Sequence, residues 1–83
     1  MADRIKQIEE LLSKDPDDVF LNYSLGMEYL SVQKFDLAIE AFAKCESLDS
    51  TYLPVKIEMG KALRSAGQLA EARVAFTRAL QAA

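Results

Sequence analysis

Residues 25–42 have the sequence LGMEYLSVQKFDLAIEAF, and residues 59–76 have the sequence MGKALRSAGQLAEARVAF. The two stretches match when the chain is shifted by 34 residues, with glycine on glycine and phenylalanine on phenylalanine. The positions that match are Leu25, Gly26, Tyr29, Ala38 and Phe42 in the first copy and Met59, Gly60, Leu63, Ala72 and Phe76 in the second. Similarity at one fixed offset of this size indicates a protein built from repeated structural units.

Each copy predicts two antiparallel helices joined by a short turn. Gly26 and Gly60 would lie in the middle of a helix, where glycine costs about 1 kcal/mol relative to alanine. That cost is explained if a neighbouring helix must come close to the backbone. The predicted small partners on the facing helices are Ala38 and Ala72, followed one turn later by Phe42 and Phe76.

The repeated residues resemble the tetratricopeptide repeat, whose 34-residue pattern runs Trp-x2-Leu-Gly-x2-Tyr, then Ala-x3-Phe, then Pro. Neither copy has the tryptophan, because Asn22 and Lys56 stand at its positions, and Ser50 stands at the proline position of the first copy. The resemblance implies an all-α fold of five helices, a right-handed stack of antiparallel helix pairs. It divides a single domain, 1–83, into a leading helix at 3–14, a first repeat at 17–48 and a second at 51–83.

Short breaks separate the predicted helices. Asp15-Pro16-Asp17-Asp18 ends the leading helix and supplies a cap for the next one, and Ser50 or Thr51 is the predicted cap later in the chain. Gly67 would take a left-handed conformation to end its helix. Gln33 aligns with Gly67, so we predict the same strained conformation there.

Composition predicts a soluble globular chain, with 51% hydrophobic and 28% charged residues. The net charge of −3 argues against nucleic acid as a partner. Residues 1–50 hold 11 acids and 5 bases, whereas residues 51–83 hold 2 acids and 5 bases, so one end is acidic and the other basic. There is no apolar run of the roughly 20 residues that a membrane helix needs. With a single cysteine, the cytoplasm is the expected location.

The side chains of common catalytic sites are missing from the sequence. There is no histidine for proton transfer near neutral pH, and no glycine-rich phosphate loop. Cys45 aligns with Ala79 and is predicted to be a small buried residue. Asp15, Asp17 and Asp18 lack the glycine and distal glutamate of a calcium loop, so we interpret them as helix-capping charges. We therefore expect no enzyme activity, no cofactor and no metal.

The resemblance implies that the first helix of each repeat lines a concave groove. The implied groove residues are Phe20, Tyr23, Met27 and Leu30 from one repeat and Pro54, Ile57, Lys61 and Arg64 from the next. The helix at 17–31 is apolar almost all round, which indicates that protein surrounds it. Its surplus apolar side chains need a cover, which could be a ligand, a second copy or the leading helix.

Lys61 and Arg64 lie three residues apart and share a helix face, where they could hold a carboxylate. The alternative is a solvated face on which Lys61 pairs with Glu58. Some family members grip acidic chaperone tails with a clamp of lysine, asparagine and arginine. Tyr23 and Met27 occupy the lysine and asparagine positions here, which argues against that partner.

Two functions follow from this sequence. The first is a non-catalytic protein–protein interaction module that binds a peptide or protein partner in the groove. The alternative is a self-assembling module, since stacked repeats favour at least three units with polar outer faces. The last helix ends in Ala79-Leu80-Gln81-Ala82-Ala83 with no polar capping helix after it, so a dimer or small closed oligomer is expected.

Overall fold

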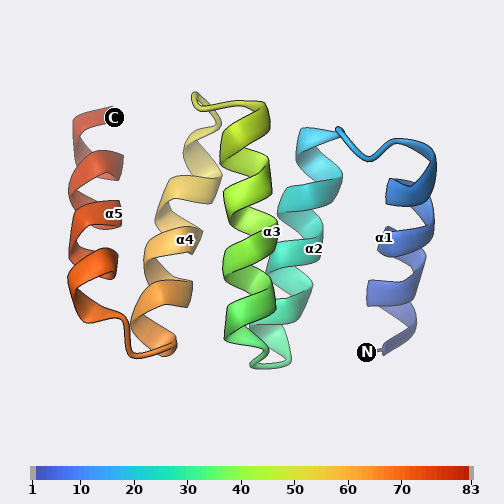
Figure 1. The fold of residues 1–83 in the computed structure, drawn as a ribbon, viewed down its shortest axis with the longest axis horizontal. Helices are drawn as coiled ribbons and strands as arrows, with labels where there is room; N and C mark the ends of the chain where they lie inside the picture. The colour runs from blue at the N-terminus through green and yellow to red at the C-terminus, as the bar shows by residue number, and fades with distance from the viewer. Residues whose placement is uncertain (1, 83) are drawn as a thin grey trace.

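The computed structural model describes the backbone of residues 2–82 and the side chains of residues 4–81. These residues form helices only, which confirms the all-α prediction and its five helices (Figure 1). The helices are α1 (Ala2–Lys14), α2 (Val19–Ser31), α3 (Phe35–Leu48), α4 (Leu53–Ser65) and α5 (Leu69–Ala82).

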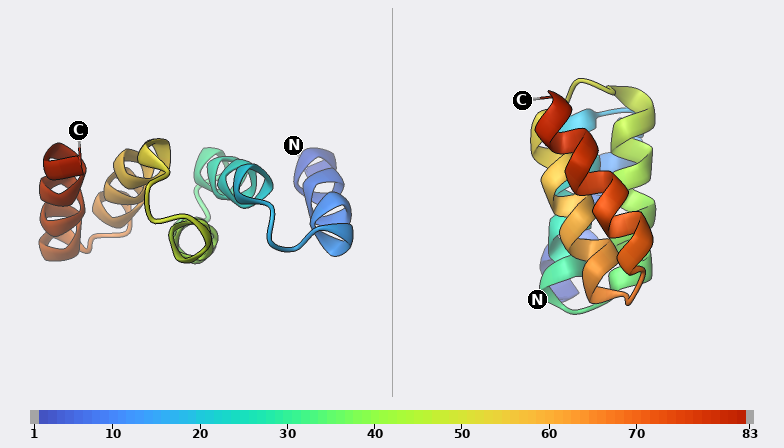
Figure 2. Two further views of the ribbon diagram at one scale, coloured as in Figure 1. Left: turned by 90° about the horizontal axis from the view of Figure 1, so that it is seen from above. Right: turned by 90° about the vertical axis from the view of Figure 1, so that its left-hand side faces the viewer.

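The helices stand in a row, each antiparallel to the next (Figure 1). Every helix packs on its neighbours in the sequence, and α2 with α4 is the one further contact between described helices. The slab measures 33 × 25 × 14 Å. Seen from above, α3 lies on one side of it and α2 and α4 lie on the other (Figure 2). The fold is therefore an α-solenoid built from successive helical hairpins.

The predicted N-cap is confirmed for α2 and wrong for α4. Asp18 caps α2, as expected of one of the three aspartates, by accepting a 2.8 Å hydrogen bond from the Leu21 backbone N–H. The prediction that Ser50 or Thr51 caps α4 is wrong, because the N-cap residue is Tyr52 and its side chain makes no cap bond. Thr51 instead donates from its N–H and its hydroxyl to Asp49 Oδ1, at 2.9 and 2.6 Å.

The two hairpins turn in the same way. Gln33 has φ 63° and Gly67 has φ 84°, which confirms that Gln33 adopts the left-handed conformation. The residue after each of them donates a backbone hydrogen bond to the end of the preceding helix. These bonds run from Lys34 N–H to Tyr29 O at 2.9 Å and from Gln68 N–H to Leu63 O at 2.8 Å. The 34-residue offset is thus obeyed by the backbone as well as by the side chains.

Glycine and phenylalanine make the close contact inside each hairpin. A Cβ built on Gly26 would lie 2.6 Å from Cδ1 of Phe42, and one on Gly60 would lie 2.7 Å from Cδ1 of Phe76. The phenylalanine ring thus comes closest to the glycine, which corrects the prediction that alanine faces it. Ala38 and Ala72 are the buried residues one turn before each ring.

The position where the family has tryptophan holds a buried asparagine in the first repeat. Asn22 is 6% exposed, and its amide donates to the carbonyl oxygens of Pro16 at 3.1 Å and Asp18 at 2.8 Å. Both acceptors belong to the turn between α1 and α2. Asn22 therefore fixes this turn with hydrogen bonds where a tryptophan would fill space.

Candidate protein-binding groove

The predicted groove residues lie on α2 and α4, which run in the same direction (Figure 1). Phe20 in the first turn of α2 is 62% exposed, and Ile57 of α4 is 40% exposed. Lys61, Arg64 and Pro54 are exposed as well. Tyr23, Met27 and Leu30 are half-buried and pack against the hydrophobic core. The predicted groove positions thus divide into an exposed set and a half-buried set that packs on the core.

Tyr23 has the best-defined contacts of the half-buried set. Its ring lies 6.1 Å from the ring of Phe42 and meets Tyr52 edge-on at 5.5 Å, centroid to centroid. Burial raises the pKa of the Tyr23 hydroxyl, and the Glu58 carboxylate raises it further. Tyr23 therefore joins α2 to the start of α4, so its ring has a packing role.

The leading helix leaves Phe20 of α2 uncovered. It is tied to α2 by an ion pair between Arg4 and Glu28 at 3.4 Å and by a hydrogen bond from the Tyr29 hydroxyl to Glu9 at 3.3 Å. Phe20 remains exposed, so the hypothesis that α1 folds over it is wrong. Tyr23 and Met27 are covered from within, by the core.

The predicted groove residues toward the end of α4 are the basic residues Lys61 and Arg64. Lys61 pairs with Glu58 at 3.2 Å, so the predicted Glu58–Lys61 pair is present. The Arg64 guanidinium lies 5.9 Å from the centroid of the Phe76 ring, within the range of a cation–π contact. Glu58 therefore offsets the charge of Lys61, and Arg64 lies about one turn further along α4.

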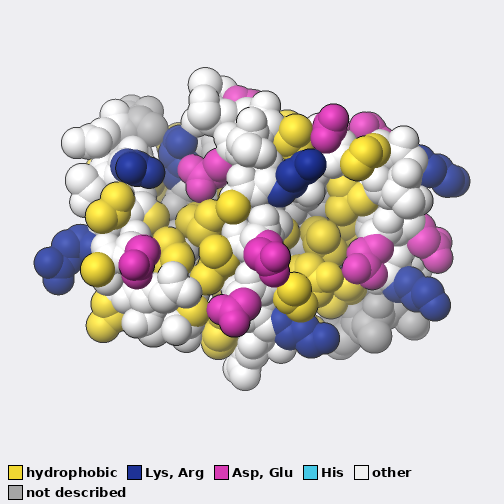
Figure 3. All heavy atoms as spheres, in the orientation of Figure 1, with side chains coloured by type: hydrophobic (Ala, Val, Ile, Leu, Met, Phe, Trp, Pro, Cys, Tyr) yellow, Lys and Arg dark blue, Asp and Glu magenta, His cyan; other side chains and the backbone are white. Residues whose placement is uncertain are grey.

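Sequence reasoning missed a hollow of about 430 Å³ on another face of α4. Its apolar walls are Ile39 of α3, Met59 and Leu63 of α4, and Val74 of α5. It is visible as a hydrophobic area between α3 and α5 (Figure 3). It exists because, among the described residues, no Cα of α3 lies within 8 Å of one in α5. The signal in the sequence was Val74, an apolar residue that the contact of α5 with α4 leaves half-exposed.

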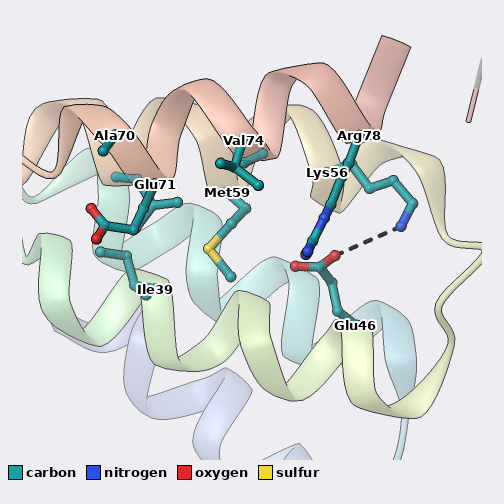
Figure 4. Close-up of a pocket in the computed structure, with 10 residues that line it drawn as sticks. Ile39, Glu46, Lys56, Met59, Ala70, Glu71, Val74 and Arg78 are labelled. Carbon is teal, nitrogen blue, oxygen red and sulfur yellow. Dashed lines mark ion pairs between the residues drawn. The ribbon is translucent and has the colours of Figure 1, made fainter. Parts of the chain in front are cut away.

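One end of this hollow is charged. Lys56 pairs with Glu46 at 3.7 Å, and Arg78 points toward the same carboxylate (Figure 4). Lys56 stands at the tryptophan position of the second repeat, where it joins α4 to α3. The described part of the chain contains no cluster of three metal-ligating side chains. It also contains no helix that is both long and apolar enough to cross a membrane.

The fold defines a class, that of helical-repeat proteins whose stacked hairpins present a surface to other proteins. A family model described as "Tetratricopeptide repeat" matches residues 21–52. The chain is also 34% identical over 79 residues to the TPR repeat-containing protein PA0015 of Pseudomonas aeruginosa, covering 95% of this chain and 75% of that one. The protein belongs to the tetratricopeptide repeat family, whose members are generally non-catalytic interaction modules.

Solved structures agree with this assignment. A crystal structure of MamA protein superposes with a TM-score of 0.88 at 27% identity, covering 94% of this chain and 43% of MamA. The second TPR of Spaghetti (RPAP3), bound to the HSP90 peptide SRMEEVD, gives a TM-score of 0.90 at 25% identity, covering 95% of this chain and 73% of that one. The chain thus spans less than half of the MamA structure and most of the RPAP3 domain.

Proposed function

We propose that the protein binds a segment of a partner protein in the groove between α2 and α4. The observation that carries this proposal is the exposure of large apolar side chains where these two helices begin. Phe20 is 62% exposed, and Leu53 and Ile57 are each 40% exposed, beside the Tyr23–Tyr52 contact that joins the helices. Apolar groups gathered in this way gain free energy when a ligand removes them from water, about 25 cal/mol per Å².

The chemistry of the groove indicates what the segment contains. Its apolar end would accept one or two bulky side chains, and Lys61 and Arg64 further along α4 would accept a carboxylate. The RPAP3 domain is bound to a peptide whose last residues include two glutamates and an aspartate, which supports peptide binding by this fold. Because Tyr23 and Met27 replace the polar clamp positions, we expect this chain to prefer apolar anchors over a purely acidic tail.

No catalysis is expected of this groove. Its titratable groups are the paired Glu58 and Lys61, Arg64 and the phenols of Tyr23 and Tyr52, and burial raises the pKa of Tyr23. None of them is a nucleophile beside a base. Binding, with no reaction, is the function that these groups favour.

A peptide-display selection tests the proposal. Peptides selected on the wild-type chain should lose at least roughly tenfold in affinity on Phe20→Glu or Ile57→Glu, because each places a charge among apolar groups. Val74→Glu is the matched control, since Val74 is 50% exposed on α5 and lies outside the groove. Tyr23 is unsuitable for this test because its ring packs on Phe42. Peptides that are indifferent to both groove variants would contradict the proposal.

A second function, self-association, is favoured by a different observation. Leu69 and Leu80 of α5 are 65% and 78% exposed, and they are the two most exposed large hydrophobic residues among the side chains that the structure describes. They belong to the helix at one end of the row (Figure 1). A second copy could cover them without using the groove.

A further inference from the structure

The exposed leucines of α5 belong to a regular stripe. Leu69, Arg73, Phe76 and Leu80 follow one another at spacings of four, three and four residues, which is the spacing of the contact positions in a pair of packed helices. We call these four residues the outer stripe. Leu69 and Leu80 are exposed, and Phe76 is half-buried: its ring rests on Gly60, and the Arg64 guanidinium lies 5.9 Å from its centroid.

The preceding repeat shows what this stripe is shaped to contact. Shifted by 34 residues, the outer stripe corresponds to Phe35, Ile39, Phe42 and Glu46 of α3. Part of that stripe meets the next helix, α4: Ile39 packs against the core to which α4 contributes, and Glu46 pairs with Lys56 of α4, although both residues also line the hollow between α3 and α5. Phe42 is fully buried there, whereas its equivalent Phe76 is not. The outer stripe is therefore a helix-binding surface that no described helix covers.

We propose that the outer stripe is the contact between two copies of this chain, with α5 packed antiparallel on α5 of the partner about a twofold axis. This proposal rests on the self-association proposed above and specifies its surface. The stripe is self-complementary in this orientation. Each Leu69 meets the partner's Leu80, and each Arg73 lies beside the partner's Phe76, where its aliphatic stem can pack on the ring.

The charge on the stripe selects this arrangement over the others. A parallel pair would bring the two Arg73 side chains face to face, and like charges at such a position oppose association. The antiparallel pair separates them. It also uses one surface on both copies, so the assembly closes as a dimer and does not grow into a filament.

Sedimentation equilibrium or light scattering from roughly 10 μM to 1 mM tests the contact, because a single pair of helices is a small interface with weak affinity. The average mass should rise from 9.2 kDa toward twice that value. Leu80→Glu and Leu69→Glu should each weaken the association at least roughly tenfold, since each buries a charge. Val74→Glu, on another face of the same helix, is the control and should leave it unchanged.

The outcomes separate the contact from the function. A chain that remains a monomer at all concentrations overturns both self-association and the proposed contact. A chain that dimerises equally well with Leu69→Glu and Leu80→Glu self-associates by another surface and overturns the contact alone. Results with the groove variants do not bear on either, because Phe20 and Ile57 lie on α2 and α4.

Cross-linking tests the register. In an equal mixture of Leu69→Cys and Leu80→Cys chains under mild oxidation, the disulfide should join one chain of each kind. The native Cys45 should not interfere because it is fully buried. Disulfides formed mainly between two identical chains would overturn the antiparallel register.

Discussion

At the scale of single residues, the backbone conformation at Gln33 is the clearest departure from what the side chain prefers. Gln33 and Gly67 hold the same place in two hairpins, with φ of 63° and 84°. The left-handed conformation costs a residue with a Cβ roughly 1–2 kcal/mol, and glycine avoids that cost. This strain was predictable from alignment with Gly67 alone, because the repeat transfers backbone geometry from one copy to the other.

Gln33→Gly should therefore stabilise the protein. Gln33 is exposed, so no buried contact is lost, although the added freedom of the unfolded chain offsets part of the gain. We expect a net gain of roughly 1 kcal/mol, or about 4–8 °C in melting temperature. Glu40→Gly, at an exposed position inside α3, is the control and should lose about 1 kcal/mol. A melting temperature of Gln33→Gly at or below that of wild type would contradict the strain.

At the scale of helices, the sequence predicted the existence of each helix more accurately than the residue that caps its N-terminus. An aspartate cap before α2 was predictable because an acceptor side chain directly before an apolar run satisfies the free N–H groups of a helix, although the sequence did not choose Asp18 from the three aspartates. Thr51 meets the same description but bonds to Asp49 instead. Both arrangements are local and close in energy, so position in the sequence cannot choose between them. The hydrogen bonds of Asn22 to the α1–α2 turn were equally hidden, because the family pattern indicated only a missing tryptophan.

The contact between helices inside each hairpin gives a prediction that distinguishes the two repeats. Gly26→Ala would place a Cβ against Phe42, which is fully buried and has no room to move. We expect a loss of roughly 1–3 kcal/mol in the free energy of unfolding, measured by urea denaturation. Gly60→Ala meets Phe76, which is half-buried and can turn outward, so the loss should be smaller.

A double variant provides the control for this contact. Gly26→Ala combined with Phe42→Leu should lose less than the sum of the two single changes, since the smaller side chain leaves space for the new methyl group. Equal losses for Gly26→Ala and Gly60→Ala would show that burial of the ring does not govern the cost.

At the scale of the whole molecule, the sequence predicted which helices stack on one another but not the free space between them. Phe20, Ile57, Lys61 and Arg64 are exposed on α2 and α4, whereas Tyr23 packs on its aromatic neighbours. The hollow between α3 and α5 depends on the angle at which successive hairpins pack. That angle results from many contacts together, so no spacing of residues predicts it.

The chain of contacts from neighbour to neighbour also determines how the molecule opens. In such a row, one hairpin can loosen while the rest stays folded. Cys45 is a natural probe of such opening. It is completely buried, and its thiol donates to Val19 O at 3.6 Å. The thiol becomes fully exposed only if α3 separates from its neighbours. Burial first, then Glu46 and Asp49, raise the pKa of the thiol from 9.0 to about 11.

We expect Cys45 to react with DTNB at pH 8 more than roughly 100-fold slower than a free thiol, since the reactive thiolate is both rare and covered. Gly26→Ala, which loosens the hairpin of Cys45, should accelerate the reaction more than Gly60→Ala does.

The raised pKa of the Cys45 thiol also determines how stability changes with pH. The unfolded thiol ionises first, so the stability due to Cys45 is complete below pH 9 and is lost as the pH rises toward about 11. Cys45→Ala should lose less stability than wild type over that range. For the labelling experiment, equal acceleration of the DTNB reaction by Gly26→Ala and Gly60→Ala would mean that the molecule opens as one unit. In that case the hairpins would not loosen separately.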